Sequence, residues 1–266
     1  MPLSDKVANF ADMKQALRDL DLFDLDAVPD YAPPRGPNVP SYLAARSVNL
    51  LYLPVKCAED TTVAAWLAAL DGVAPNRLET GFTQKTLRQW KRQAGQHLSF
   101  TVVSHPLARA HDAFCRFILP NTPDGFTGIR EGLARTYKVP LPETPEDPAY
   151  DKKAHHAAFL AFLQFLKGNL GGQTSVRIDG SWASQEACLR GLAQFGMPDA
   201  VLRAPRLGEE LSNLAHRLDI DAPNVPDVPK PGPHSLDAIY NTDLERAARA
   251  AYQRDYMMFG FGAWRD

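Results

Sequence analysis

Two segments of this chain follow the same pattern: an apolar strand, a short polar loop and an amphipathic helix. The first covers residues 48–71, where the apolar run Leu50–Leu53 precedes a loop carrying Lys56. The second covers residues 98–119, with a strand over Phe100–Val103 and a helix that opens on a His-Pro pair, since proline is favoured at a first helical position. Strands that alternate with helices predict an α/β fold with a central parallel sheet flanked by helices.

In such sheets ligands bind at the carboxyl ends of the strands, so we expect both loops to lie at one edge. A loop that enters a helix presents free backbone N–H groups, which favour an anion. Lys56 adds a mobile positive charge, and Thr61 and Thr62 are placed to cap the helix or to donate to phosphate oxygens. The loop lacks the Walker glycines, so a plain structural turn stays an alternative.

The rest of the chain divides into an N-terminal part and a continuous α/β domain. Residues 1–47 are expected to form a short helix at 8–19 and a proline-rich arm at 26–42, and residues 48–266 the domain itself. Apolar periodicity predicts one further strand at 199–204. It predicts further helices at 83–95, 155–172, 181–196 (capped by Ser181), 207–220 and 242–258.

Composition excludes several classes of protein. With 29 basic and 31 acidic residues in 266, nothing favours nucleic acid or an anionic membrane. Three cysteines without a CxxC spacing predict neither a disulfide framework nor a metal site, and they favour a reducing cytoplasm. No apolar run approaches the roughly 20 residues of a membrane span, and no signal peptide is recognisable. The oligomeric state stays open.

Three stretches resemble the PAPS-dependent carbohydrate sulfotransferase superfamily, in particular the bacterial type grouped as sulfotransferase family 2. "LYLPVKCAEDTT" looks like the family's 5′-phosphosulfate loop, and "FTVVSHPLARAHDAF" looks like its 3′-phosphate motif. "SWASQ", "PDAVLRAPRLGEELSNLAHRLDI" and "IYNTDLERAARAAYQRDYMMFGF" look like its C-terminal half, so the likeness runs from about residue 48 to about residue 262. The resemblance implies a fold like that of the P-loop nucleotide kinases. It also implies PAPS as sulfuryl donor, a hydroxyl acceptor often on a sugar, and no metal.

The resemblance also assigns roles to residues. Lys56 would steady charge on the bridging oxygen of the leaving group, and His105, expected to be partly exposed, is a candidate base for the acceptor proton. The cofactor-binding set that it implies is Lys56, Cys57, Ala58, Thr61, Thr62, Ser104 and Asp112.

This chain departs from the family pattern at the phosphate sites. Ser104 stands where the family has an arginine, and Asp112 stands where it has a serine. Glu59 and Asp60 replace the small residues of the first loop. Two readings therefore stay open: a sulfotransferase with an altered PAPS site, and a catalytically silent relative that serves as a binding or scaffold module. A nucleotide kinase is disfavoured by the missing Walker glycines.

Overall fold

The computed structural model describes residues 42–122, 125–192 and 197–265. It contains a four-stranded sheet with the strand order β1-β2-β3-β4. The strands are β1 (Leu43–Ala45), β2 (Leu50–Tyr52), β3 (Leu98–Val103) and β4 (Ala200–Arg203). The helices are α2 (Asp60–Asp71), η3 (Pro75–Arg77), α3 (Gln84–Ala94), α4 (Pro106–Ala113), the π-helix η4 (Phe114–Ile118), α5 (Thr127–Thr136), α6 (Lys152–Leu170), α7 (Gln185–Leu192), η5 (Ala204–Arg206), α8 (Leu207–His216), α9 (Leu236–Ile239), α10 (Thr242–Ala251) and α11 (Gln253–Phe259).

The sheet confirms that the strands of the two strand–loop–helix units are parallel neighbours. It differs from the predicted parallel sheet at one edge strand. β2 pairs parallel with β3, with Tyr52 opposite Phe100, and β3 pairs parallel with β4. β1, however, pairs antiparallel with β2, so the sheet is mixed rather than parallel. The predicted domain boundary at residue 47 cuts through this hairpin, whose turn is held to α2 by the Asp71 carboxylate, the acceptor of the Arg46 and Ser47 N–H groups. The predicted helix at 8–19 lies outside the described residues.

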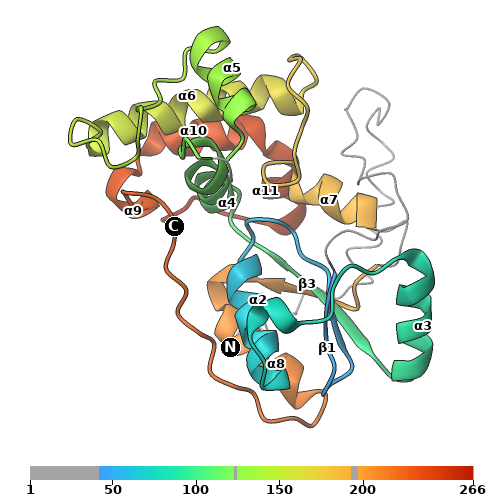
Figure 1. Ribbon diagram of the computed structural model, residues 1–266. Coiled ribbons are helices and arrows are strands. Elements are labelled where there is room, and N and C mark those ends of the chain that lie inside the picture. Colours follow the sequence, from blue (N-terminus) through green and yellow to red (C-terminus); the bar gives the residue numbers. More distant parts are fainter. Residues whose placement is uncertain (1–41, 123–124, 193–196, 266) are drawn as a thin grey trace, which may run out of the picture.

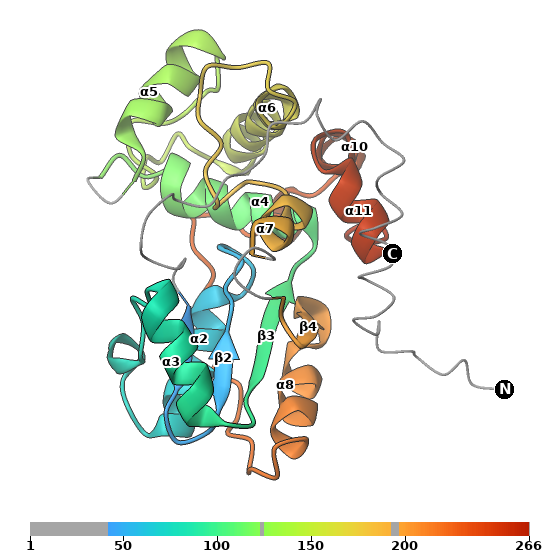
Figure 2. The ribbon, with the colours of Figure 1, turned by 90° about the vertical axis from the view of Figure 1, so that its right-hand side faces the viewer.

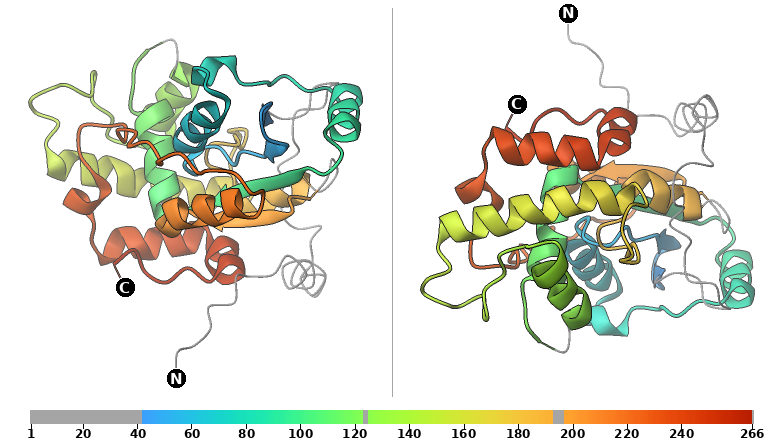
Figure 3. Two further views of the ribbon diagram at one scale, coloured as in Figure 1. Left: turned by 90° about the horizontal axis from the view of Figure 1, so that it is seen from below. Right: turned by 90° about the horizontal axis from the view of Figure 1, so that it is seen from above.

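Apolar side chains cover both faces of the sheet because successive strand residues point to opposite sides. On one face, Leu50, Tyr52 and Phe100 pack with the buried sides of α2 and α8. Most other helices form a layer beyond the carboxyl ends of the parallel strands, as Figures 1 and 2 show. In this upper layer the long helix α6 lies beside α10 (Figure 3). Leu51 and Val55 belong to the core that this layer shares with the sheet.

Two helices differ from the prediction in where they break or begin. The segment 242–258 breaks into α10 and α11 at Tyr252, whose hydroxyl donates to the Trp182 carbonyl (2.8 Å). The helix expected at 181–196 begins only at Gln185, because Ser181 bonds to Asp179 instead of capping it. The N-terminus of α7 is satisfied by Asp255 of α11, which accepts the N–H groups of Gln185 (2.8 Å) and Glu186 (3.0 Å).

The buried carboxyl of Asp255 makes stability depend on pH. Burial raises the pKa of Asp255 from 3.8 to about 6, so the folded state holds this proton more tightly than the unfolded chain does. The free energy of unfolding is therefore expected to fall as pH rises from about 4 to about 6, by about 2–3 kcal/mol from this group, and then to level off. In Asp255→Asn this component is lost. Urea unfolding at pH 4.5 and 6.5 measures it, and parallel pH curves for the two proteins would contradict the assignment.

Candidate anion-binding site at the β2–α2 loop

The loop between β2 and α2 curls tightly as it enters the helix. Cys57 and Glu59 have φ values of 63° and 58°, in the left-handed region that non-glycine residues seldom adopt. Within the described part of the chain, no side-chain hydrogen bond caps α2 at Glu59. The first N–H groups of this helix therefore stay available, and together with the helix dipole they favour an anion.

Lys56 is the exposed cation of this loop. Its side chain is 49% exposed, and its Nζ lies 3.8 Å from Oδ1 of Asp179, a residue of the loop that precedes α7. At that distance and exposure the ion pair is weak, so an incoming anion can displace Asp179. Thr61 is also exposed on the first turn of α2, where its hydroxyl can donate to the same anion.

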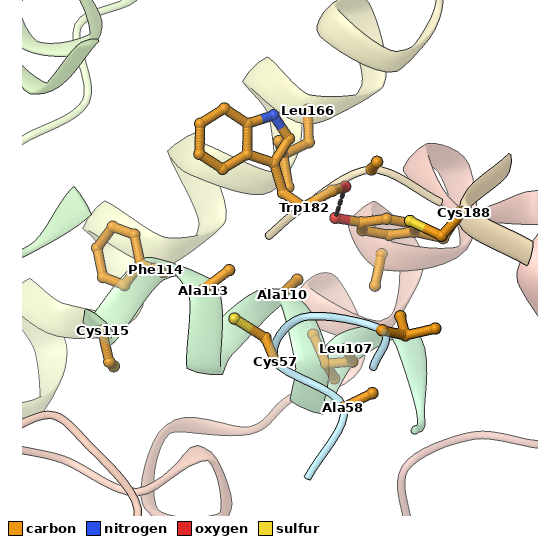
Figure 4. Close-up of a cluster of buried hydrophobic side chains, with 14 of the residues drawn as sticks. Cys57, Ala58, Leu107, Ala110, Ala113, Phe114, Cys115, Leu166, Trp182 and Cys188 are labelled. Atoms are coloured by element: carbon orange, nitrogen blue, oxygen red, sulfur yellow. Dashed lines mark hydrogen bonds between the residues drawn. The ribbon is translucent and has the colours of Figure 1, made fainter. Parts of the chain in front are cut away.

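The other predicted residues of this loop are buried. Cys57 and Ala58 pack beside the small residues Ala110 and Ala113 of α4, which let the loop approach closely (Figure 4). Burial raises the pKa of the Cys57 thiol, so this cysteine stays protonated and unreactive. Thr62 donates its hydroxyl hydrogen to Glu59 Oε2 (3.2 Å). These residues shape the loop, and their side chains do not point to an anion.

Glu59 and Asp60, the two acidic residues of the loop, are both paired with cations. Both carboxylate oxygens of Glu59 lie within hydrogen-bonding distance of Lys230 Nζ. Lys230 belongs to the segment joining α8 to α9, which runs past α2 in Figure 1. Asp60 accepts a hydrogen bond from Arg116 Nη1 (3.1 Å). The negative charges that the sequence placed in this loop are thus largely neutralised.

Asp112 also faces the loop and shares Arg116 with Asp60. Its Oδ2 lies 2.9 Å from Arg116 Nε, and its side chain is only 12% exposed. Burial raises the pKa of this carboxyl, with Arg116 acting in the opposite direction. One guanidinium therefore balances two carboxylates, and little of its charge is left for a ligand phosphate.

Ser104 and His105 have structural roles. The backbone of Ser104 exchanges two hydrogen bonds with the Gln185 side chain (both 2.8 Å), and its side chain is buried. His105, expected to be partly exposed, is also buried; its Nδ1 accepts from the Leu107 N–H, and its Nε2 donates to the Gly262 carbonyl. Both imidazole nitrogens are used, so the geometry does not support His105 as the base.

Arg109 joins the two loops, a role that the sequence pattern did not predict. Its side chain is buried and donates from Nε to the Lys56 carbonyl (2.8 Å), from Nη1 to Ala183 (2.5 Å) and from Nη2 to Gly180 (2.6 Å). Asp179 and Lys230 were also missed, because their contribution depends on chain segments far apart in the sequence. Helical periodicity gave no signal for Arg109, because it lies off the apolar stripe of Leu107, Ala110 and Phe114 in the predicted helix.

Comparison with known proteins adds no assignment. No family model, no curated protein and no solved structure matches this chain. Within the described residues, no helix is both long enough and apolar enough to cross a bilayer.

Replacing Arg109 by lysine is expected to destabilise the protein. Lysine keeps the charge, but its compact ammonium cannot reach three carbonyls in the fork geometry of a guanidinium. Hydrogen bonds from charged donors contribute about 1.5–3 kcal/mol each, so Arg109→Lys should lose about 2–4 kcal/mol in urea unfolding. Arg88→Lys, at an exposed position of α3, is the matched control. Equal loss in the two variants would show that the three carbonyl contacts are not stabilising.

Proposed function

We propose that this protein is a sulfotransferase that transfers a sulfuryl group from PAPS to a hydroxyl of a carbohydrate or small molecule. The observation that carries the proposal is the meeting of the two strand–loop–helix units. β2 and β3 are parallel neighbours, and Arg109 of the second unit binds the Lys56 carbonyl of the first. The proposed fold is accordingly that of the sulfotransferases related to P-loop nucleotide kinases.

Lys56 and the N-terminus of α2 would hold the 5′-phosphosulfate group. The ammonium is half-exposed and close to a helix end without a side-chain cap in the described chain. A cation there stabilises the charge that develops on the bridging oxygen as the sulfuryl group leaves. In this arrangement Asp179 positions Lys56 until the donor replaces it.

The acceptor proton needs a different base from His105. Asp179 has a carboxylate oxygen 3.8 Å from Lys56 Nζ, and its side chain is 31% exposed. Its Oδ1 also accepts hydrogen bonds from the N–H and hydroxyl groups of Ser181 (2.8 and 2.7 Å), which orient it. Asp179 is our candidate for the general base, a role that requires it to leave Lys56 when donor binds.

One observation favours the alternative, a catalytically silent binding module. Glu59 is held by Lys230 at the entrance to α2, and Asp112 occupies Arg116. Both arrangements place carboxylates where a phosphate-binding protein would offer donors. A silent relative would keep the fold and bind PAP weakly or not at all.

The binding of PAP, the desulfated product, tests the proposal without knowledge of the acceptor. PAP at 100 times its Kd should stabilise the protein by about 2.7 kcal/mol and raise the melting temperature. Lys56→Ala should reduce this shift and abolish sulfuryl transfer, because the ammonium meets the 5′-phosphate. Lys85→Ala, an exposed lysine of α3, should behave as the wild type. No shift with millimolar PAP would exclude the sulfotransferase, and an equal shift with AMP would exclude recognition of the 3′-phosphate.

Removing the negative charge at Asp112 should strengthen PAP binding. In Asp112→Asn, Arg116 Nε loses its ion pair and becomes available for a phosphate, while the side-chain volume is unchanged. A charge-assisted hydrogen bond of about 1.5–3 kcal/mol corresponds to a tenfold or greater decrease in Kd. Adding Ser104→Arg to this variant is unsuitable, since the Ser104 side chain is buried.

Calorimetry with PAP measures this effect against a matched control. Asp243→Asn removes an exposed carboxylate that pairs with Arg246 (3.4 Å) far along the chain, and it should leave the Kd unchanged. Unchanged or weaker binding in Asp112→Asn would show that Arg116 does not bind the nucleotide.

A further inference from the structure

Outside the candidate site, three potential metal ligands meet in the core, and we call them the His–Cys cluster: His111, Cys115 and His155. The two Nε2 atoms are 3.0 Å apart. Cys115 Sγ lies 3.6 Å from His111 Nε2 and 4.0 Å from His155 Nε2. The first two residues are an i, i+4 pair on α4 and η4, while the third comes from α6. The CxxC criterion used for the sequence does not detect this spacing.

These separations match those of ligands around one tetrahedral ion. Zinc binds imidazole nitrogen at about 2.0–2.1 Å and thiolate sulfur at about 2.3 Å. A tetrahedral angle between such bonds places two nitrogens about 3.3 Å apart and a nitrogen and a sulfur about 3.6 Å apart. The three observed distances, 3.0, 3.6 and 4.0 Å, depart from these values by at most about 0.4 Å. Small rotations of the side chains would remove the difference.

The chemistry of the three side chains suits the same ion. The imidazoles of His111 and His155 are buried, and burial disfavours a charged ring, so each keeps a lone pair for a metal. Imidazole nitrogen and thiolate sulfur are both zinc ligands in proteins.

The cluster is enclosed by segments from distant parts of the chain. Exposed fractions are 7% for His111, 3% for Cys115 and 0% for His155. Gly232, with φ +98°, packs so closely that a Cβ there would lie 2.5 Å from Cys115 Sγ. A further imidazole, His234, lies with its ring centroid 5.5 Å from that of His155. Its Nε2 donates to the Tyr150 carbonyl (3.0 Å), which leaves Nδ1 as an acceptor.

We propose that His111, Cys115 and His155 bind one zinc ion that joins α4 and η4 to α6. The enclosure leaves no path for a substrate, so the role is structural, with the fourth tetrahedral position filled by a group other than these three side chains. On binding, the Cys115 thiol loses its proton to solvent and the thiolate takes a coordination position, so one proton is released per ion. Because Arg109 and Asp112 lie on the same helix, the ion stiffens one wall of the candidate anion site.

Metal analysis of the full-length protein is the first test. The protein is stripped with a chelator, given excess zinc and passed through gel filtration. We expect one zinc per chain to be retained and the melting temperature to rise above that of the stripped protein. Calorimetry in two buffers of different ionisation enthalpy should give about one proton released per ion at pH 7. Wild-type protein that retains no zinc would overturn the proposal, whatever the variants do.

Cobalt substitution identifies the ligands. Bound to the wild type, Co²⁺ should show a near-ultraviolet thiolate-to-cobalt charge-transfer band, and Cys115→Ser should lose it. His155→Gln should weaken zinc binding by more than about 100-fold, since even replacing a group that only hydrogen-bonds a metal ligand costs about 10–100-fold in metal affinity. His216→Gln, at an exposed position of α8, is the matched histidine control. Far-ultraviolet circular dichroism confirms folding, and a charge-transfer band that persists in folded Cys115→Ser would overturn the assignment of the sulfur ligand.

Discussion

The buried guanidinium of Arg109 is the contact on which the arrangement of the functional edge depends. It is almost entirely removed from solvent and bonds three backbone carbonyls, one in the β2–α2 loop and two in the segment before α7. A charge buried this deeply is tolerated only when its donors are satisfied, so these two segments must lie where their carbonyls converge. That requirement places Lys56 opposite Asp179 and seats the loop against the small residues of α4. Without it, two parallel strands would still pair, but their loops would have no fixed separation.

The charges around the β2–α2 loop bear on the choice between the two proposed functions, a sulfotransferase and a silent binding module. Glu59, Asp60 and Asp112 bring three carboxylates to the place where the proposed donor would bind its phosphate, and Lys230 and Arg116 neutralise most of that charge. Lys56 remains as the half-exposed cation. An anion is therefore attracted mainly by Lys56 and by the free end of α2, which predicts binding that is real but weaker than in a site with an arginine fork. Two members of the His–Cys cluster lie on the helix that carries Arg109 and on its continuation: His111 on α4 and Cys115 on η4.

Much of the element order followed from local pattern. Apolar runs bounded by proline predicted β2 and β3, and helical periodicity predicted α3, α6 and α8 within a few residues. The edge strand β1 was missed because three residues beside a proline-rich stretch carry no periodic signal of their own. The start of α7 and the break at Tyr252 were also missed, since a carboxylate from α11 and a hydroxyl bond to Trp182 set them across 70 residues of chain. The burial of His105, which was expected to be partly exposed, was missed for the same reason: its ring nitrogens bond to the C-terminal tail as well as to its own helix.

By itself, the sequence determined that two strand–loop–helix units exist, that they have the same polarity, and that Lys56 follows the first strand. Those features arise from hydrophobic periodicity and chain direction, which are local. Only the tertiary structure decided which cation meets which carboxylate, that Ser104 is buried, and that two histidines and a cysteine meet in the core. Such pairings join residues tens of positions apart, and burial determines whether a side chain is a ligand, a counter-ion or part of the core. No pattern within a single helix carries that information.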